Sequence, residues 1–467
     1  MGSQLYTHGI WSVAQYNSNN AWLYNANNGR INNDNKYNTN HGRSLGYDIG
    51  DLSGNDEFMQ LYREVWAAYL ICRKSKIHGK KQLEFEFDCA GVLSVALRLW
   101  FFEYHPEKAT AFWITEPKAR EVIAAEVSDK IVQTWFNEHL KPQLEANWYD
   151  PDSYSCRKGK GGLAAVRALS EKMHKETNGF VCPAIIVKRD LRAFFMSIYT
   201  EIVERYMVEF IEQNFGEDYQ LRNRLIWLAR IIYRSTPQFH CELKSHPLTW
   251  SLMEEKRIML NKLRGLPLGN VTSQTAANFI TTLFIGLIRE KGYEFVIYTD
   301  DSPIIVKLSR WDEWRKVDQP EIEQFIKDTL HLEWHKNKVY VQPIEHGVEF
   351  LGYKLKFDRI LPSDRVVHNF KWKTHCYIEK FAKNNYYDIQ MVEDFMAMFN
   401  SYMGHLRWCD ARKLEKEQIA TLRNTKLGKC FNIYQNKIKI KKTYTRVYRI
   451  MRSNIIRENQ LLTKKAA

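Results

Sequence analysis

Three aspartates stand next to apolar runs whose composition is typical of β-strands. Asp300 and Asp301 interrupt "YEFVIYTDDSPIIVKL" (293–308), and Asp190 follows a β-branched run in "AIIVKRDLRAFFMSI". The first pattern predicts two strands that close a tight turn with the adjacent aspartates at its tip. Three carboxylates on neighbouring strands repel one another unless shared cations cancel their charge. We therefore expect a phosphoryl-transfer site with two Mg²⁺ ions, which Mn²⁺ could replace.

Each acid also has an ordinary structural interpretation. An Asp-Asp pair is common in turns, because the side chains hydrogen-bond to nearby backbone. Asp190 could instead cap a helix that begins at Leu191. The neighbouring motifs must decide between these interpretations.

The elements around these acids indicate an α+β fold. Helical spacing of apolar residues follows Asp51 and recurs between Asn369 and Arg423, and residues 83–104 are expected to form one further helix. The predicted buried positions are Phe58, Leu61, Val65, Ala68 and Tyr69, then Met391, Phe395, Met398, Phe399 and Tyr402. Between these helical ends, short apolar strands alternate with helices up to Leu361.

Length and composition suit a large enzyme of two or three domains. The chain has 467 residues, of which 45% are hydrophobic and 13% aromatic. It contains no run of about 20 apolar residues and no apolar signal-peptide core, which predicts a cytoplasmic protein without a membrane partner. Its eight cysteines form no CxxC pair or metal-binding cluster.

Positive charge is concentrated at the C-terminal end. The net charge is +14, and residues 424–467 carry twelve Lys or Arg against one acid, Glu458. Basic and apolar residues alternate there, which suits either a solvated tail or an element whose cationic side follows a phosphate backbone. The candidate nucleic-acid contacts are Lys437, Lys439, Lys441, Lys442 and Arg446.

Four segments resemble the palm motifs of reverse transcriptases, in the order and approximate spacing of that family. They are "RDLRAFFMSI", "RGLPLGNVTSQTAANF", "YTDD" and "EFLGYKL", within a resemblance that covers roughly residues 114–423. It implies a right-hand polymerase of fingers, palm and thumb. Such an enzyme would bind two metal ions, an RNA template and a DNA primer, and would add deoxynucleotides to the primer. Domains are expected at residues 1–50 (Asn-rich extension), 51–189 (N-terminal helices and fingers), 190–361 (palm with part of the fingers) and 362–467 (helical thumb and basic tail).

The resemblance also implies roles for single residues. Asp190, Asp300 and Asp301 would be the catalytic metal ligands, and Phe195 an aromatic gate against a 2′-hydroxyl, although Phe194 and Phe195 also suit a core. Gly269 would let the backbone approach the nucleotide, Gln274 would lie beside it, and Lys338 would lie near the pyrophosphate or simply on the surface. The remaining implied contacts are Arg157, Lys158 and Lys160 for the triphosphate, and Arg120, Tyr298, Gly352 and Tyr353 for nucleic acid.

Within the family the chain is most similar to enzymes of diversity-generating retroelements and antiphage defence systems. The features that carry this are Gln274 after Ser273, the loop "CRKGKG" and the helical "FNSYMGHLRWCDARKL". The expected activity is RNA-directed DNA synthesis on a partner noncoding RNA. Untemplated or protein-primed synthesis and a catalytically inactive RNA-binding scaffold stay open, as does a protein partner or homo-oligomer.

The N-terminal segment is biased in composition. Eleven of the 24 residues from Asn17 to Asn40 are asparagine, and Asn28-Gly29 is a hairpin-turn signal. The segment resembles an asparagine-studded stretch of formylglycine-enzyme-like lectin folds. We expect either a disordered tail or an ordered hairpin that docks on the polymerase body and contacts the RNA partner.

Overall fold

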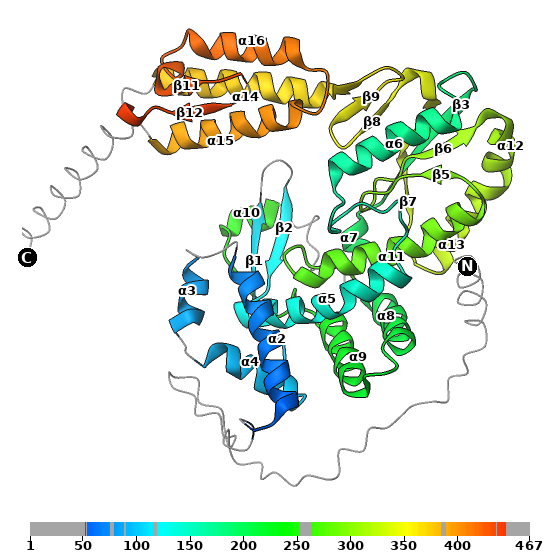
Figure 1. Ribbon diagram of the computed structural model, residues 1–467, viewed down its shortest axis with the longest axis vertical. Helices are drawn as coiled ribbons and strands as arrows, with labels where there is room; N and C mark the ends of the chain where they lie inside the picture. Colours follow the sequence, from blue (N-terminus) through cyan, green and yellow to red (C-terminus); the bar gives the residue numbers. More distant parts are fainter. Residues whose placement is uncertain are drawn as a thin grey trace, which may run out of the picture. The chain divides into compact units, whose positions relative to one another are not determined.

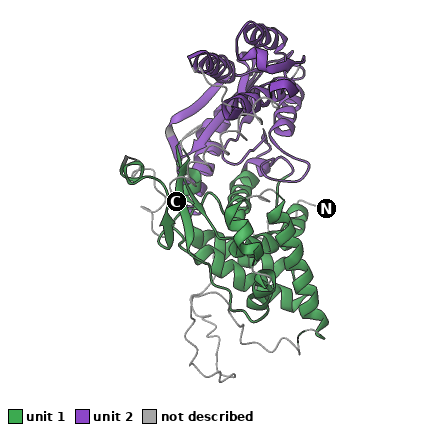
Figure 2. Cartoon of the chain, turned by 90° about the vertical axis from the view of Figure 1, so that its left-hand side faces the viewer, with its two compact units in different colours: residues 1–150, 193–287 green, residues 151–192, 288–467 purple. Residues whose placement is uncertain are grey.

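The protein consists of two compact units, each assembled from two stretches of chain (Figure 2). Unit 1 comprises Met1–Asp150 and Ala193–Leu287, and unit 2 comprises Pro151–Arg192 and Ile288–Ala467. The computed structural model describes residues 52, 54–74, 79–87, 90–114, 119–252, 264–383, 389–435 and 437–444. The predicted Asn-rich extension (1–50) lies outside these residues, and the domain boundaries after residues 50, 189 and 361 stay predictions.

Unit 1 is mainly helical. Its helices are α2 (Asp56–Arg73), α3 (Lys80–Phe87), α4 (Gly91–Trp100), α5 (Val127–Asn147), α7 (Phe194–Ser197), α8 (Thr200–Asn214), α9 (Tyr219–Arg234), α10 (Pro247–Leu252) and most of α11 (Val271–Glu290). A three-stranded sheet has the order β2-β1-β4, from β1 (Ala109–Ile114), β2 (Arg120–Ala124) and β4 (Cys241–Leu243). The single helix expected over residues 83–104 was wrong, because α3 ends at Phe87 and α4 begins at Gly91.

Helix α2 shows how the local sequence determines where a helix begins and which of its faces is buried. The side chain of Asn55 caps it by accepting a hydrogen bond from the Phe58 N–H, 2.9 Å away, and acids occupy its first turn. All five positions predicted to be buried are buried. An apolar stripe at helical spacing therefore places this helix correctly.

Helix α11 is the one helix among the described residues that is long and apolar enough to cross a membrane. Of its apolar window, 78% is buried inside the protein. Its start is held by α5: Gln133 Oε1 accepts from the Val271 N–H (2.9 Å), and the Asn137 amide donates to the Val271 carbonyl (3.0 Å). This burial is typical of a core helix.

Unit 2 is built on a four-stranded antiparallel sheet of order β5-β6-β3-β7 (Figure 1). Its strands are β3 (Ala184–Leu191), β5 (Glu294–Phe295), β6 (Ile304–Lys307) and β7 (Trp334–Pro343). Helix α6 (Gly162–Glu176) packs against it, with Val166 and Leu169 buried beside Ile186 of β3. After β6 the chain forms η4 (Leu308–Arg310), α12 (Trp311–Glu313), the π-helical turn η5 (Trp314–Asp318) and α13 (Gln319–Asp328).

A small sheet and a helical bundle complete unit 2. The turn η6 (Ile344–His346) leads into β8 (Val348–Phe350), β9 (Tyr353–Leu355) and β10 (Ile360–Pro362), which pair in the order β10-β9-β8. The bundle consists of α14 (Asp364–Lys383), α15 (Ile389–Leu406) and α16 (Arg412–Arg423), with η7 (Gly428–Cys430), β11 (Phe431–Ile433) and β12 (Ile438–Ile440) against them (Figure 1). Met391, Phe395 and Phe399 are buried as predicted, and Met398 and Tyr402 are partly buried against the same core.

Candidate active site

The two aspartates of "YTDD" lie at a tight hairpin turn, as the sequence predicts. Tyr298 and Asp301 pair through two backbone hydrogen bonds of 3.0 and 3.2 Å, which leaves Thr299 and Asp300 as the turn residues. Thr299 has a φ of +62°, a strained conformation for a β-branched residue. Its hydroxyl lies 2.8 Å from the Ser155 hydroxyl. The turn that presents Asp300 is thus held from the side by another segment.

Asp190 lies on β3, between β6 and β7. Strands β3 and β6 pair antiparallel up to Val187 opposite Ile304, and Asp190 follows three residues later on β3, near enough to Asp300 and Asp301 for its charge to raise the pKa of both. Asp190 is part of a strand that runs to Leu191, so the interpretation as a helix cap at Leu191 was wrong. The fold therefore brings Asp190 within electrostatic reach of Asp300 and Asp301, from which the sequence separates it by about 110 residues.

The three acids interact electrostatically. Burial raises the pKa of Asp300, and the negative charges of Asp190 and Asp301 raise it further. Burial also raises the pKa of Asp301, and the charge of Asp190 adds to that rise. Both carboxylates are therefore harder to ionise than free aspartate, first because they are buried and then because of the neighbouring negative charge.

Two lysines on the sheet supply countercharge. Lys338 of β7 lies 2.5 Å from Asp190 Oδ2, and Lys188 of β3 lies 3.0 Å from Asp301 Oδ1. Lys338 was predicted from the resemblance and Lys188 was not. Lys188 precedes Asp190 by two residues, so strand alternation places both on the same face, and that alternation was the signal available in the sequence.

The donor set suits a hard divalent cation, because such ions prefer carboxylate oxygens and Asp300 stands next to two further negative charges. In the part of the chain that the structure describes, no three His, Cys, Asp or Glu side chains are grouped at metal-ligand spacing. Lys338 and Lys188 each hold one of the carboxylates instead. A metal at Asp190 would require Lys338, which is 56% exposed, to move aside.

The predicted triphosphate loop lies beside the aspartate turn. Ile297 pairs with the backbone of Asp152 and Tyr154 (2.9 and 3.0 Å), and Ser155 contacts Thr299. Arg157 donates to the Ser153 carbonyl (2.8 Å). Lys160 donates to the Pro151 carbonyl and lies 4.5 Å from the centre of the Tyr154 ring.

The end of this loop suits an anion. Lys158 is exposed, Gly159 and Gly161 have φ of +74° and +134°, and Gly161 precedes the first turn of α6. The free N–H groups at a helix start and three nearby cations favour phosphate oxygens. Arg157, Lys158 and Lys160 thus lie on one loop anchored next to Thr299.

The hairpin of "EFLGYKL" contains a two-residue turn in which Leu351 and Gly352 both have positive φ (+50° and +86°). A Cβ at Gly352 would meet His405 at 3.2 Å. Tyr353 is 5% exposed, stacks on His405 with ring centres 4.1 Å apart and donates to the His405 carbonyl (3.1 Å). This favours a structural role for the Tyr353 side chain over the predicted nucleic-acid contact.

Tyr298 is half-buried and packs against the core of the unit 2 sheet.

The remaining predicted contacts with nucleotide or template, except for the basic C-terminal residues, lie in unit 1. Phe194 is buried and Phe195 is half-exposed on α7, so Phe194 is the core ring of the pair. Gly269 has a φ of +138°, and a Cβ there would lie 2.8 Å from the Ile123 carbonyl oxygen of β2. Gln274 donates to Asn278 within α11 (3.3 Å), and Arg120 is exposed at the start of β2.

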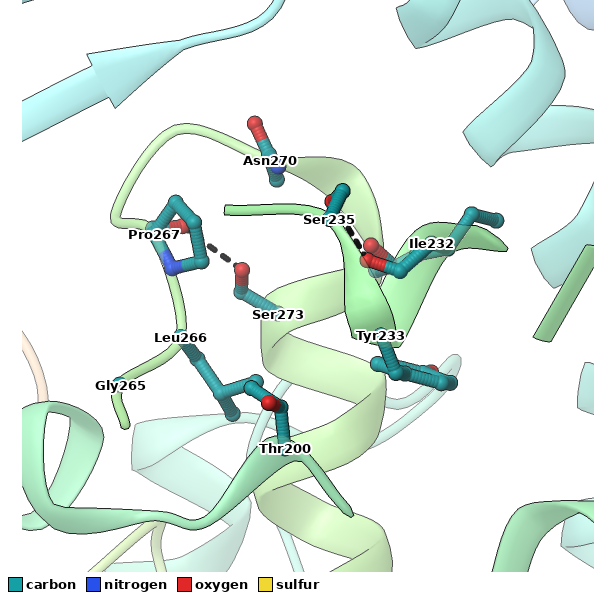
Figure 3. A pocket seen from close by; sticks show the side chains of 10 residues that line it. Thr200, Ile232, Tyr233, Ser235, Gly265, Leu266, Pro267, Asn270 and Ser273 are labelled. Atoms are coloured by element: carbon teal, nitrogen blue, oxygen red, sulfur yellow. Dashed lines mark hydrogen bonds between the residues drawn. The ribbon is translucent and has the colours of Figure 1, made fainter. Parts of the chain in front are cut away.

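A small pocket lies against the "GLPLGN" loop in unit 1 (Figure 3). Gly265, Leu266 and Pro267 line it from the loop, and Tyr233 and Ser235 line it from the end of α9. The Ser273 hydroxyl donates to the Pro267 carbonyl at 2.7 Å, which fixes the loop on α11. The pocket thus lies beside the loop that carries Gly269, and none of the three aspartates lines it.

The basic residues of the C-terminal region alternate on a strand. Lys437 and Lys439 are exposed, whereas Ile438 is buried in the bundle core and Ile440 packs against it. Lys441 is half-exposed and Lys442 exposed, and Arg446 lies outside the described residues. Residues 438–440 form strand β12, on which Lys439 is exposed, with Lys437 exposed just before it, and their contact with nucleic acid stays a prediction.

No protein-family model and no curated protein sequence matches the chain. Among solved structures it is similar to the apo telomerase of Candida tropicalis, with 12% identity and a TM-score of 0.40 over 68% of this chain and 58% of the telomerase. It is also similar to that telomerase truncated of its C-terminal domain, with 11% identity and a TM-score of 0.39 over 55% of each chain. The matched region thus spans just over half of each telomerase chain, and at these TM-scores the likeness assigns no function.

Proposed function

We propose that the protein is an RNA-directed DNA polymerase whose chemistry takes place at Asp190, Asp300 and the turn that carries Asp300. The observation that carries this proposal is geometric: Asp300 lies at the tip of the Tyr298–Asp301 turn, and Asp190 of β3 is near enough for its charge to raise the pKa of Asp300. A structural turn gains nothing from mutual repulsion, whereas a site that binds cations requires it. The order of the four motifs along the chain supports a polymerase over other phosphoryl-transfer enzymes.

Asp190 and Asp300 would hold the divalent ions, Mg²⁺ or Mn²⁺. When bound, such ions lower the pKa of an attacking 3′-hydroxyl and stabilise a leaving pyrophosphate. Before substrate enters, Lys338 would pair with Asp190. When the nucleotide binds, the exposed Lys338 side chain would turn from Asp190 toward the phosphates. The same lysine would then neutralise charge on the leaving group.

The basic loop would bind the triphosphate of the incoming nucleotide. Arg157, Lys158 and Lys160 present three cations, and the glycines let the backbone approach closely. The contact between Ser155 and Thr299 fixes the loop relative to the turn that carries Asp300. Binding and positioning of the nucleotide would thus be coupled to the geometry of the acids.

Selection of deoxynucleotides and contacts to the template are assigned to unit 1. The half-exposed Phe195 ring would exclude a 2′-hydroxyl, and the tight approach at Gly269 leaves no room for a side chain. Gln274 and Arg120 would contact the nucleotide and the template strand. The cationic face of β12 in unit 2 would follow a nucleic-acid backbone.

The template would be a partner noncoding RNA, and the biological role either sequence diversification or phage defence. Two other functions remain in competition: untemplated or protein-primed synthesis, and RNA binding without catalysis. The intact set of Asp190, Asp300 and Asp301 favours an enzyme over a scaffold, since a binding module gains nothing from clustered acids.

Primer extension with Mg²⁺ tests the proposal. Purified protein is given an RNA template with a DNA primer, all four deoxynucleotides and, in parallel, no RNA. Template-directed product that disappears in Asp300→Asn is the expected result. Homopolymer made without RNA would favour untemplated synthesis, and no incorporation by wild type on any template would reject the enzyme.

A further inference from the structure

The three aspartates differ in how their countercharge is held. Lys338, the partner of Asp190, is 56% exposed and touches one carboxylate oxygen, Oδ2. Lys188, the partner of Asp301, is 20% exposed and reaches both oxygens, at 3.0 Å (Oδ1) and 3.3 Å (Oδ2). An exposed ion pair exchanges easily with water, whereas a half-buried, multiply bonded pair is costly to break.

Lys188 is also bound to a second element. Its ammonium donates to the Glu349 carbonyl (2.7 Å) and lies 5.6 Å from the centre of the Phe350 ring. Both residues belong to β8, one strand of the hairpin with the Leu351–Gly352 turn. Lys188 therefore joins three elements of unit 2: its own strand β3, the aspartate turn and the β8–β9 hairpin.

We infer that Asp301 is a positioning residue rather than a metal ligand, and that Lys188 is its partner in holding the β8–β9 hairpin against the aspartate turn. This inference rests on the proposed function in one respect, since it concerns the metal site of that reaction. It leaves Asp190 and Asp300 as the carboxylates free to take a cation.

The geometry gives this link a mechanical consequence. The turn of the hairpin is fixed at its other side by His405 of α15, through the Tyr353 stack and the His405–Gly352 contact of 3.2 Å. Lys188 thus contacts Glu349 and Phe350 just before the turn. His405 contacts Gly352 in the turn and Tyr353 after it. Loss of the Lys188 contacts would free the hairpin on the side that faces the acids.

Direct metal binding separates the two roles. Mn²⁺ binding to the whole protein, without nucleotide or nucleic acid, is followed by electron paramagnetic resonance. We expect Asp190→Asn and Asp300→Asn to weaken Mn²⁺ binding at least tenfold, and Asp301→Asn to leave it within about threefold of wild type, which corresponds to 0.7 kcal/mol. A loss in Asp301→Asn as large as in Asp300→Asn would overturn the inference.

A double-mutant cycle tests the partnership. Lys188→Met and Asp301→Asn each leave a half-buried charge or donor unpaired, so the double variant should unfold at a higher temperature than the sum of the two single losses predicts. Amide exchange at Leu351 and Gly352 should accelerate in both single variants. Lys307→Met with Glu176→Gln, a pair on the same unit at 3.3 Å, is the matched control and should show no change in that exchange.

Additive losses in the cycle, or unchanged exchange at the hairpin turn, would overturn the positioning role. These readouts do not depend on polymerisation. Wild-type protein that binds Mn²⁺ and shows the coupling but extends no primer would reject the proposed function while it supports the inference.

Discussion

Unit 1 and unit 2 each contain a buried aspartate with a raised pKa, but the two units stabilise their buried carboxylates with different partners. In unit 1, Asp129 is 2% exposed and accepts from the Tyr104 hydroxyl (2.9 Å) and the Glu107 N–H (3.0 Å). In unit 2, Asp190 and Asp301 are held by lysine side chains, and their negative charges raise the pKa of Asp300. The first arrangement uses fixed neutral donors, and the second uses lysine cations, of which Lys338 is exposed and able to move whereas Lys188 is held by further contacts.

The difference separates a structural acid from a functional one. Neutral donors on a rigid frame hold one carboxylate in place and leave no room for exchange. Repelling carboxylates with movable partners store unfavourable energy that a substrate or metal can release.

The largest expected effect is loss of activity at the unit 2 acids. Asp300→Asn and Asp190→Asn should reduce primer extension on the order of 10³-fold, because each removes a negative charge needed to hold a divalent ion. Their free energy of unfolding in urea should stay equal or rise, since repulsion is removed. If either variant lost stability as well as activity, that acid would also support the fold, and the distinction from Asp129 would be wrong.

The next effect is the pH dependence caused by Asp129. Burial raises its pKa from 3.8 to about 6 in the folded protein. Between these pH values the folded state holds a proton that the unfolded state has released, so the unfolding free energy contributed by Asp129 falls as pH rises.

Asp129→Asn does not titrate. The stability of wild type minus that of the variant should therefore fall by roughly 2 kcal/mol between pH 4 and pH 7, which is most of the ~3 kcal/mol that a pKa rise from 3.8 to about 6 implies at 1.36 kcal/mol per unit. Urea unfolding at four pH values measures this difference. A difference that stays flat with pH would show that Asp129 is not the buried acid described above.

A smaller effect is expected at Lys338. Lys338→Ala should lower the rate of nucleotide addition about tenfold, because the leaving group loses one cation, and should change folding stability by less than about 1 kcal/mol as expected for an exposed pair. Lys338→Arg keeps the charge and should recover part of the rate. Rapid-quench measurement of single nucleotide addition separates this step from binding.

The smallest effect concerns the cationic face of β12. Lys437→Gln with Lys439→Gln should weaken binding to RNA a few-fold and reduce the slope of log K against log salt by up to about 2. Lys383→Gln, an exposed lysine at the end of α14, is the control. An unchanged salt slope would show that the lysines at β12 are solvated and do not contact nucleic acid.

Much of the local structure was predictable from the sequence. The turn at Thr299–Asp300, the strand before Asp190, the buried face of α2 and the alternation along β12 depend on residues near one another in the chain. The helix expected over residues 83–104 failed where α3 ends and α4 begins, since both halves are apolar enough to continue a helical pattern.

By itself, the sequence determined which residues have the chemistry: three acids beside strands, a basic glycine loop and alternating lysines. Only the tertiary structure decided which cation holds which acid. Lys188 and Lys338 face different aspartates because β3 is central in the sheet and its neighbours approach in fixed registers. The physical reason is that periodicity encodes which side of an element a residue faces, whereas strand order and register decide what lies opposite.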